Sequence, residues 1–147
     1  MYLKELKAEV KINSSPETVW SVISDFSRYP DWNPIITQIT GELKLGAKLE
    51  IHLTTVGGKS RIYYPEITKV ESPIEIRWYG KFFFSGIFSG ERILTIDKIS
   101  DNEVNFINRE IFSGIGVKFT PKKMENDILS SFESMNNSLK NYIERKI

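Results

Sequence analysis

The sequence predicts one α+β domain, in which a curved antiparallel sheet of about seven strands wraps around a long C-terminal helix. Three observations lead to this prediction. Segments that alternate apolar and polar residues follow one another along residues 36–112, with tight turns between them. Strands connected in this way form an antiparallel sheet with one buried face. Residues 121–145 then carry apolar side chains at intervals of three and four, the pattern of an amphipathic helix that covers such a face.

The chain begins with a strand and two short helices. Residues 3–12 alternate between apolar and charged side chains, as in a half-buried strand. Ser15 and Pro16 suit the N-cap and the first position of a helix, because serine accepts a hydrogen bond from a free N–H and proline has none to leave unpaired. Apolar spacing extends this helix over about residues 16–25. The two prolines in residues 26–34 stand four apart and permit one further short turn.

The remaining strands come in close succession. We expect them at about residues 36–43, 47–53, 61–71, 74–80, 87–99 and 104–112. Gly57-Gly58 and Asp101-Asn102 mark two of the hairpin turns. The glycine-rich apolar segment at residues 82–90 has no clear period and fits either a strand edge packed on the helix or a mobile loop.

Composition argues against several classes of function. The 20 basic and 19 acidic residues are spread along the chain and give a net charge of +1, so no nucleic-acid platform is expected. One histidine and no cysteine argue against disulfides, metal sites and thiolate nucleophiles. His52 alternates in phase with Lys48 and Glu50 and belongs on the outer face. No apolar run approaches the about 18 residues of a membrane span, so we expect no integral membrane association. We further expect a cytoplasmic protein that is a monomer or a weak homodimer and has no cofactor.

Two motifs near the N-terminus resemble a known superfamily. Residues 12–20 (INSSPETVW) are similar to the opening I-x-A-S-P-E-x-V-W of START-like, SRPBCC-type proteins, and residues 25–34 (DFSRYPDWNP) to their D-F-x-x-Y-P-x-W-N-P. Shorter matches follow in family order at residues 76–80, 90–91 and 110–114. The superfamily includes polyketide cyclase/dehydrase-like and coenzyme-Q-binding-like branches. The resemblance implies a helix-grip fold over residues 1–147, with an apolar ligand cavity between the sheet and the C-terminal helix.

The cavity implied by the resemblance would be lined by the inward faces of these elements. The candidate ligand-binding residues are Trp32, Tyr64, Trp78, Phe82, Phe84, Phe88, Phe106, Asn108, Glu110, Phe112, Met124, Ile128 and Phe132. Most of these side chains would equally suit a solid apolar core. Residues 82–90, if mobile, would lie over the cavity mouth.

Glu110 is the one candidate catalytic residue. It alternates in phase with Phe106 and Phe112, so it faces the cavity if they do. A carboxyl group in an apolar pocket has a raised pKa and can act as a general acid or base. The alternative is an ion pair at the rim with Arg92, Arg109 or Lys118.

Three functions remain open at this stage. The favoured one is non-catalytic binding or carriage of a small hydrophobic ligand, such as a lipid, an isoprenoid or a polyketide-like molecule, in a cavity on the order of several hundred Å³. The second is a cyclase or dehydrase that uses Glu110 together with Asn108 or a tyrosine. The third is a co-chaperone-like interaction module with an exposed apolar patch around residues 82–88.

Overall fold

The computed structural model describes residues 3–81 and 89–145. Its strands are β1 (Leu3–Ile12), β2 (Ile36–Thr40), β3 (Glu50–Thr54), β4 (Ser60–Tyr63), β5 (Glu66–Glu71), β6 (Glu75–Lys81), β7 (Ser89–Ser100) and β8 (Glu103–Ser113). Its helices are α1 (Pro16–Ile23), the short 3-10 helix η1 (Phe26–Arg28), α2 (Tyr29–Trp32), the 3-10 helix η2 (Ile115–Phe119) and α3 (Lys122–Glu144). The predicted α+β helix-grip class is confirmed.

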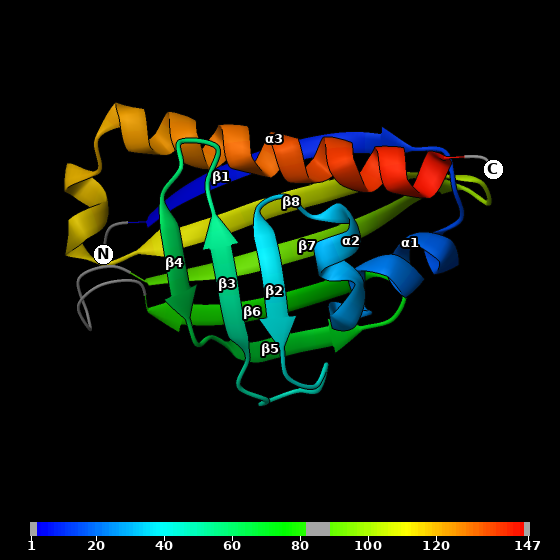
Figure 1. The fold of residues 1–147 in the computed structure, drawn as a ribbon, viewed down its shortest axis with the longest axis horizontal. Helices are drawn as coiled ribbons and strands as arrows, with labels where there is room; N and C mark the ends of the chain where they lie inside the picture. The colour runs from blue at the N-terminus through cyan, green and yellow to red at the C-terminus, as the bar shows by residue number, and fades with distance from the viewer. Residues whose placement is uncertain (1–2, 82–88, 146–147) are drawn as a thin grey trace.

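Two antiparallel sheets and α3 enclose the core. Five strands pair in the order β1-β8-β7-β6-β5, and three in the order β2-β3-β4. Backbone hydrogen bonds join the two sheets at one edge, from Leu49 N to Pro65 O (2.8 Å) and from Ile67 N to Ala47 O (2.9 Å). In Figure 1 the three-stranded sheet lies in front of the five-stranded sheet, and α3 runs along the top. The helix therefore covers the side opposite the joined edge.

Eight strands form where about seven were predicted, because the segment at residues 61–71 is split. Its two parts, β4 and β5, belong to different sheets. Pro65 separates them, since it has no N–H to contribute to a strand ladder. The chain passes close to β6 at this point. A Cβ atom on Gly80 would lie 3.1 Å from the Pro65 Cβ, so only glycine fits there without a shift.

The motif at residues 25–34 closes one end of the core. The buried Tyr29 donates its hydroxyl proton to the Ile23 carbonyl at 2.7 Å. The Oδ1 atom of Asn33, also buried, accepts hydrogen bonds from the N–H groups of Ile35 (2.9 Å) and Ile36 (2.8 Å). The Asn33 side chain thus pairs backbone donors at the start of β2 that would otherwise be buried without partners. We conclude that this motif shapes the fold.

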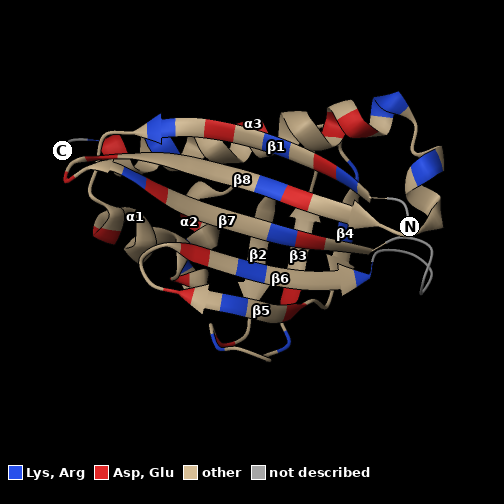
Figure 2. Cartoon of the chain, turned by 180° about the vertical axis from the view of Figure 1, so that it is seen from behind, with Lys and Arg blue, Asp and Glu red and all other residues tan. Residues whose placement is uncertain are grey.

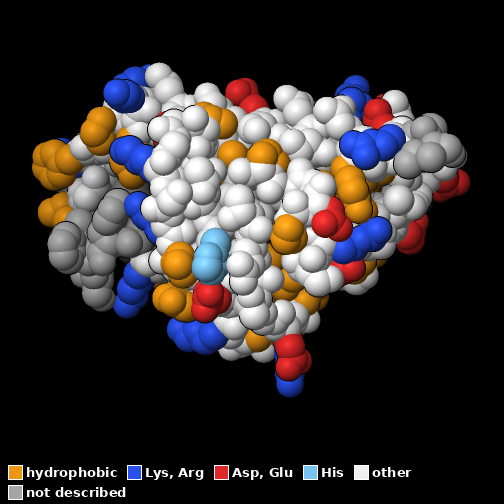
Figure 3. All heavy atoms as spheres, in the orientation of Figure 1, with side chains coloured by type: hydrophobic (Ala, Val, Ile, Leu, Met, Phe, Trp, Pro, Cys, Tyr) orange, Lys and Arg blue, Asp and Glu red, His pale blue; other side chains and the backbone are white. Residues whose placement is uncertain are grey.

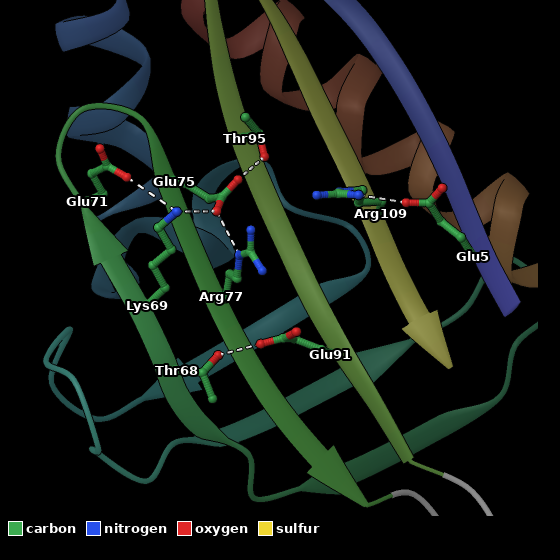
Figure 4. Close-up of polar contacts among 9 residues, drawn as sticks. All are labelled: Glu5, Thr68, Lys69, Glu71, Glu75, Arg77, Glu91, Thr95 and Arg109. Atoms are coloured by element: carbon green, nitrogen blue, oxygen red, sulfur yellow. Dashed lines mark hydrogen bonds and ion pairs between the residues drawn. The ribbon is translucent and has the colours of Figure 1, made fainter. Parts of the chain in front are cut away.

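Charged residues occur along all five strands of the larger sheet (Figure 2). Figure 4 shows the densest group, in which the carboxylate of Glu75 receives three donors. Thr95 Oγ1 lies 2.7 Å from Oε1, and Arg77 Nε and Lys69 Nζ lie 2.7 and 3.0 Å from Oε2. Burial by itself raises the pKa of this carboxyl, but the three donors outweigh burial and lower it to about 2.

We expect Glu75→Gln to lower the free energy of unfolding at pH 7 by about 1–2 kcal/mol. The folded-state pKa lies below the usual value of 4.5, so the carboxylate stabilises the fold above that pH. Its contribution is lost as the pH falls from 4.5 towards 2, and the variant and the wild type should converge there. Urea unfolding at pH 7 and pH 3 measures this difference.

The matched control is Thr68→Ala, which removes a 2.8 Å hydrogen bond to Glu91 on the same face but leaves the Glu75 group intact. This exposed contact should contribute less than about 0.5 kcal/mol at either pH. A Glu75→Gln effect of the same size at pH 3 and pH 7 would contradict the assignment.

Candidate ligand-binding cavity

A cavity of about 190 Å³ lies beneath the N-terminal half of α3. Its other walls come from β3, β4, β7 and β8. The apolar lining consists of Ile35, Leu53, Phe112, Met124, Ile128 and Phe132. The polar groups that the cavity reaches include Arg61, Arg92, Glu110, Asp127 and Ser131. It is thus a mainly apolar chamber with charged groups contributed by β4, β7, β8 and α3.

Strand alternation and register bring the polar groups together. Burial alternates without interruption along β8, so that Asn108, Glu110 and Phe112 all face inward. On the neighbouring strand β7, Arg92 pairs directly with Glu110, and Leu94 pairs with Asn108. The Cβ atoms of directly paired residues on adjacent strands lie about 4.5–5.5 Å apart. The register alone therefore sets a guanidinium beside a carboxyl group inside the sheet.

Arg92 lines the cavity and is 3% exposed. Its Nε donates to Asn108 Oδ1 at 2.8 Å, and its Nη1 is 3.6 Å from Glu110 Oε1. The guanidinium also stacks 4.3 Å from the centre of the Phe132 ring, and its Nη2 lies 3.6 Å from the Met135 sulfur. A guanidinium has five N–H donors. The contacts with described residues leave donors on both Nη atoms for a ligand.

Glu110 is buried and poised to change its protonation state near neutrality. Burial raises the pKa of its carboxyl to about 7, although the charges of Arg92 and Arg61 oppose the rise. The 3.6 Å separation from Arg92 is longer than the about 2.7–2.9 Å of a charge-assisted hydrogen bond, which explains why burial prevails. Near pH 7 this carboxyl can therefore either donate or accept a hydrogen bond.

Tyr63 supplies a further buried hydroxyl near these charges. Burial, reinforced by the charge of Glu110, raises the pKa of this phenol. The indole Nε1 of Trp78 donates to its oxygen at 3.3 Å. Tyr63 therefore remains a neutral hydroxyl at physiological pH.

Hydrogen bonds join α3 to the β3–β4 turn at one rim of the cavity. The N–H of Gly57 donates to Asp127 Oδ1 at 2.7 Å, and the N–H of Val56 donates to Ser131 Oγ at 3.1 Å. A Cβ atom on Gly57 would lie 2.8 Å from the same carboxylate oxygen, so glycine permits this approach. The turn and the helix are thus held together beside the cavity.

All the predicted lining residues except Tyr64 fall into three groups in the structure. Those that border the cavity are Glu110, Phe112, Met124, Ile128 and Phe132. Those packed in the buried core away from it are Trp32, Trp78 and Phe106, while the buried Asn108 supports Arg92. Those outside the described residues are Phe82, Phe84 and Phe88. The large aromatic residues of the middle group fill space that the sequence predicts to be hollow.

Tyr64 is the one described candidate that faces solvent, with 63% of its surface exposed. Its neighbour Tyr63 is the tyrosine that points inward, at 5% exposure. Burial alternates without interruption through Pro65, with Tyr63, Pro65 and Ile67 buried, so Tyr64 belongs to the outward phase and its prediction as a lining residue is wrong. The rim ion pair considered for Glu110 also differs: its partner Arg92 is buried, whereas Arg109 pairs with Glu5 on the outer face at 2.7 Å.

The two arginines of the cavity are the main residues that sequence reasoning did not place there. Arg92 enters only as one of three candidate rim partners of Glu110, and Arg61 does not enter at all. A usable signal exists for Arg92, since it alternates in phase with Leu94 and Ile96 on β7. Arg61 follows a glycine-rich turn on a short strand, where no clear alternation shows its direction.

The single histidine lies on the surface, as expected (Figure 3). His52 Nε2 is 2.7 Å from Glu50 Oε2, its neighbour on the same face of β3. Among residues 3–81 and 89–145, no group of His, Cys, Asp and Glu side chains is arranged to hold a metal ion. No helix in this part of the chain has the length and apolarity needed to cross a bilayer.

A family comparison agrees with the geometry of sheet, helix and cavity. The model of the family described as "Polyketide cyclase / dehydrase and lipid transport" matches residues 4–144. The chain belongs to this family. The match confirms the START-like, SRPBCC resemblance and supports its polyketide cyclase/dehydrase-like branch. A comparison with curated protein sequences found no match.

Several solved structures have the same fold as this chain. A START superfamily protein from Mycobacterium smegmatis superposes with a TM-score of 0.77 at 16% identity, covering 95% of this chain and 97% of that one. An aromatase/cyclase from Streptomyces sp. R1128 gives 0.79 at 12% identity, covering 98% and 95%. Norcoclaurine synthase from Thalictrum flavum gives 0.74 at 10% identity, covering 99% and 90%. The polyketide cyclase/dehydrase family fold therefore extends over nearly the whole chain.

Proposed function

We propose that this protein binds a small amphipathic molecule with an apolar body and one anionic or strongly polar end. The buried guanidinium of Arg92, which lines this mainly apolar cavity, is the observation that carries the proposal. A buried charge is costly unless it is paired. Glu110 pairs with it only loosely and takes up a proton near neutral pH. A ligand carboxylate or phenolate would complete the pairing, while its apolar body lies against Ile128 and Phe132.

The size of the cavity favours a compact ligand. Its volume of about 190 Å³ is smaller than the several hundred Å³ that the sequence leads us to expect. Trp78, Phe106 and Tyr29 pack in the buried core between the sheets. An apolar cavity of roughly 150 Å³ accepts benzene, so one ring with a short substituent fits here. The Thalictrum flavum neighbour, solved with dopamine and hydroxybenzaldehyde, supports a ligand of this size.

Filling the cavity tests this proposal. We expect the wild type to bind para-isopropylbenzoate saturably with one site per chain, measured by isothermal titration calorimetry. Ile128→Trp places an indole in the cavity. Affinity for the probe should fall by more than about tenfold, because the indole occupies the volume that the probe needs.

The matched control is Ser130→Trp, which adds the same side chain to the exposed side of α3. It should bind like the wild type. Equal affinity in the wild type and in a folded Ile128→Trp protein would contradict binding in this cavity.

The raised pKa of Glu110 favours a second candidate, a proton-transfer enzyme of the cyclase type. A base with a pKa of about 7 is well matched to neutral pH. The guanidinium groups of Arg61 and Arg92 would stabilise the enolate left when a proton is removed beside a carbonyl. Hydrogen–deuterium exchange at the central carbon of benzoylacetone, followed by NMR, tests this candidate. Equal exchange rates with wild type and Glu110→Gln would leave simple binding as the function.

A further inference from the structure

Two large apolar side chains are exposed on η2, at one end of the molecule. Ile115 is 57% exposed and Phe119 is 72% exposed. Between them, Val117 is buried and anchors the segment in a small apolar cluster with Phe112 and Phe132. The fold therefore holds η2 in place while its other two apolar side chains point into solvent. An arrangement of this kind indicates contact with another surface.

Lysines surround these apolar side chains. From Ser113 to Met124 the chain carries three lysines, Lys118, Lys122 and Lys123, and no acidic residue, although the net charge of the whole chain is only +1. In Figure 3 the hydrophobic side chains at the η2 end lie among basic ones, with no acidic side chain visible between them. The nearest carboxylate along the chain is Glu125, which is buried and pairs with Lys4 at 2.7 Å and, at the longer distance of 4.0 Å, with Lys122. We call Ile115, Lys118, Phe119, Lys122 and Lys123 the η2 patch.

We infer that the η2 patch docks the protein onto an anionic lipid bilayer. Phe119 and Ile115 would enter the interface between headgroups and acyl chains, while the lysine ammonium groups contact the anionic headgroups. The patch is far smaller than the about 20–30 residues that each partner contributes to a stable protein–protein interface. Binding to a bilayer needs no shape complementarity. Anionic headgroups would pair with the lysines, and the acyl-chain region would accept the two apolar side chains.

The patch also adjoins the cavity. Met124 and Ile128, in the first turns of α3, line the cavity immediately after the lysines. A small hollow under η2 is lined by Val117 and Thr120 and shares Phe112 and Ile128 with the cavity. Docking through the η2 patch would therefore place the cavity next to the membrane. The inference goes beyond the proposed function and does not depend on it, because vesicle binding is measured without any cavity ligand.

Vesicle co-sedimentation tests the inference. Wild-type protein should sediment with vesicles of seven parts phosphatidylcholine to three parts phosphatidylglycerol, and bind pure phosphatidylcholine at least about fivefold more weakly. Raising the salt concentration should weaken binding to the anionic vesicles. The double variant Ile115→Ser/Phe119→Ser should partition at least about tenfold less, and so should Lys122→Glu/Lys123→Glu.

Two control variants distinguish docking through the η2 patch from lipid binding elsewhere on the molecule. Leu45→Ser removes an equally exposed leucine, 68% accessible, on a loop outside the patch, and should bind vesicles like the wild type. Leu53→Trp should also bind normally, since it fills the cavity from β3 and does not contact the cluster that anchors η2.

Three results would overturn the inference. The first is wild-type protein that does not sediment with anionic vesicles. The second is loss of binding in Leu53→Trp but not in the Ile115→Ser/Phe119→Ser variant, which would assign the association to the cavity. The third is a Phe119-dependent dimer in sedimentation velocity without vesicle binding, which would make a second copy of the chain the occupant.

Discussion

Arg92→Met is expected to weaken binding of para-isopropylbenzoate by roughly 10- to 100-fold. A hydrogen bond to a charged group contributes about 1.5–3 kcal/mol, and the guanidinium of Arg92 lines the cavity in which the probe would bind. Affinity for the uncharged analogue para-isopropylbenzamide should change less than about threefold, since it gains no ion pair. Calorimetric titration of both probes measures the ratio.

The double variant Arg92→Met/Glu110→Gln is the control for this substitution. Removing one member of a buried pair leaves the other without its partner, whereas removing both members is far less disruptive. The double variant should therefore be folded and still discriminate less between benzoate and benzamide than the wild type does. Equal loss of affinity for both probes would show that Arg92 supports the cavity wall and does not recognise an anion.

Glu110→Gln is expected to remove a pH dependence of stability that the wild type shows between pH 5 and pH 8. The folded-state pKa of about 7 lies above the usual 4.5, so the folded protein retains a proton that the unfolded chain has released. Stability from this group is fully present below about pH 4.5 and is lost as the pH rises towards and past 7. The free energy of unfolding of the variant, relative to wild type, should rise by roughly 2–3 kcal/mol over this range.

Urea unfolding of both proteins at pH 5 and pH 8 measures this change. The remaining titratable groups are common to both proteins and cancel in the comparison. The control is Glu5→Gln, which removes an ion pair to Arg109 on the outer face and should show no such trend with pH. A constant difference between Glu110→Gln and wild type across the range would contradict a raised pKa.

Local sequence patterns predict the elements of this fold because each pattern has one physical cause. The alternation along β8 and the apolar stripe of α3 arise from burial of one face, and both are readable without a structure. The inward direction of Glu110 follows from the same alternation. Tyr64 shows where this reasoning was misapplied, since it alternates out of phase with the buried Tyr63 and Ile67 and faces solvent. Pro65 moves the chain to the other sheet without changing that alternation.

The cavity itself is less predictable because it depends on which side chains fill the space between layers. Trp78 and Phe106 face inward, as the pattern predicts, but they pack into a solid core. Arg92 borders the cavity although it was not predicted to do so. An inward-facing charged residue is hard to recognise from sequence without knowledge of its partner. Only the pairing of β7 with β8 brings it beside Glu110.

A methyl-resolved NMR titration with para-isopropylbenzoate tests the central claim most directly. Binding in the cavity predicts saturable shifts of the methyl signals of Met124, Ile128 and Leu53, which line it, and no shift at the exposed Leu45. Shifts that saturate with one site per chain and vanish in Ile128→Trp would establish an amphipathic ligand site beneath α3. Unchanged Met124 and Ile128 signals at probe concentrations that shift surface methyls would contradict it.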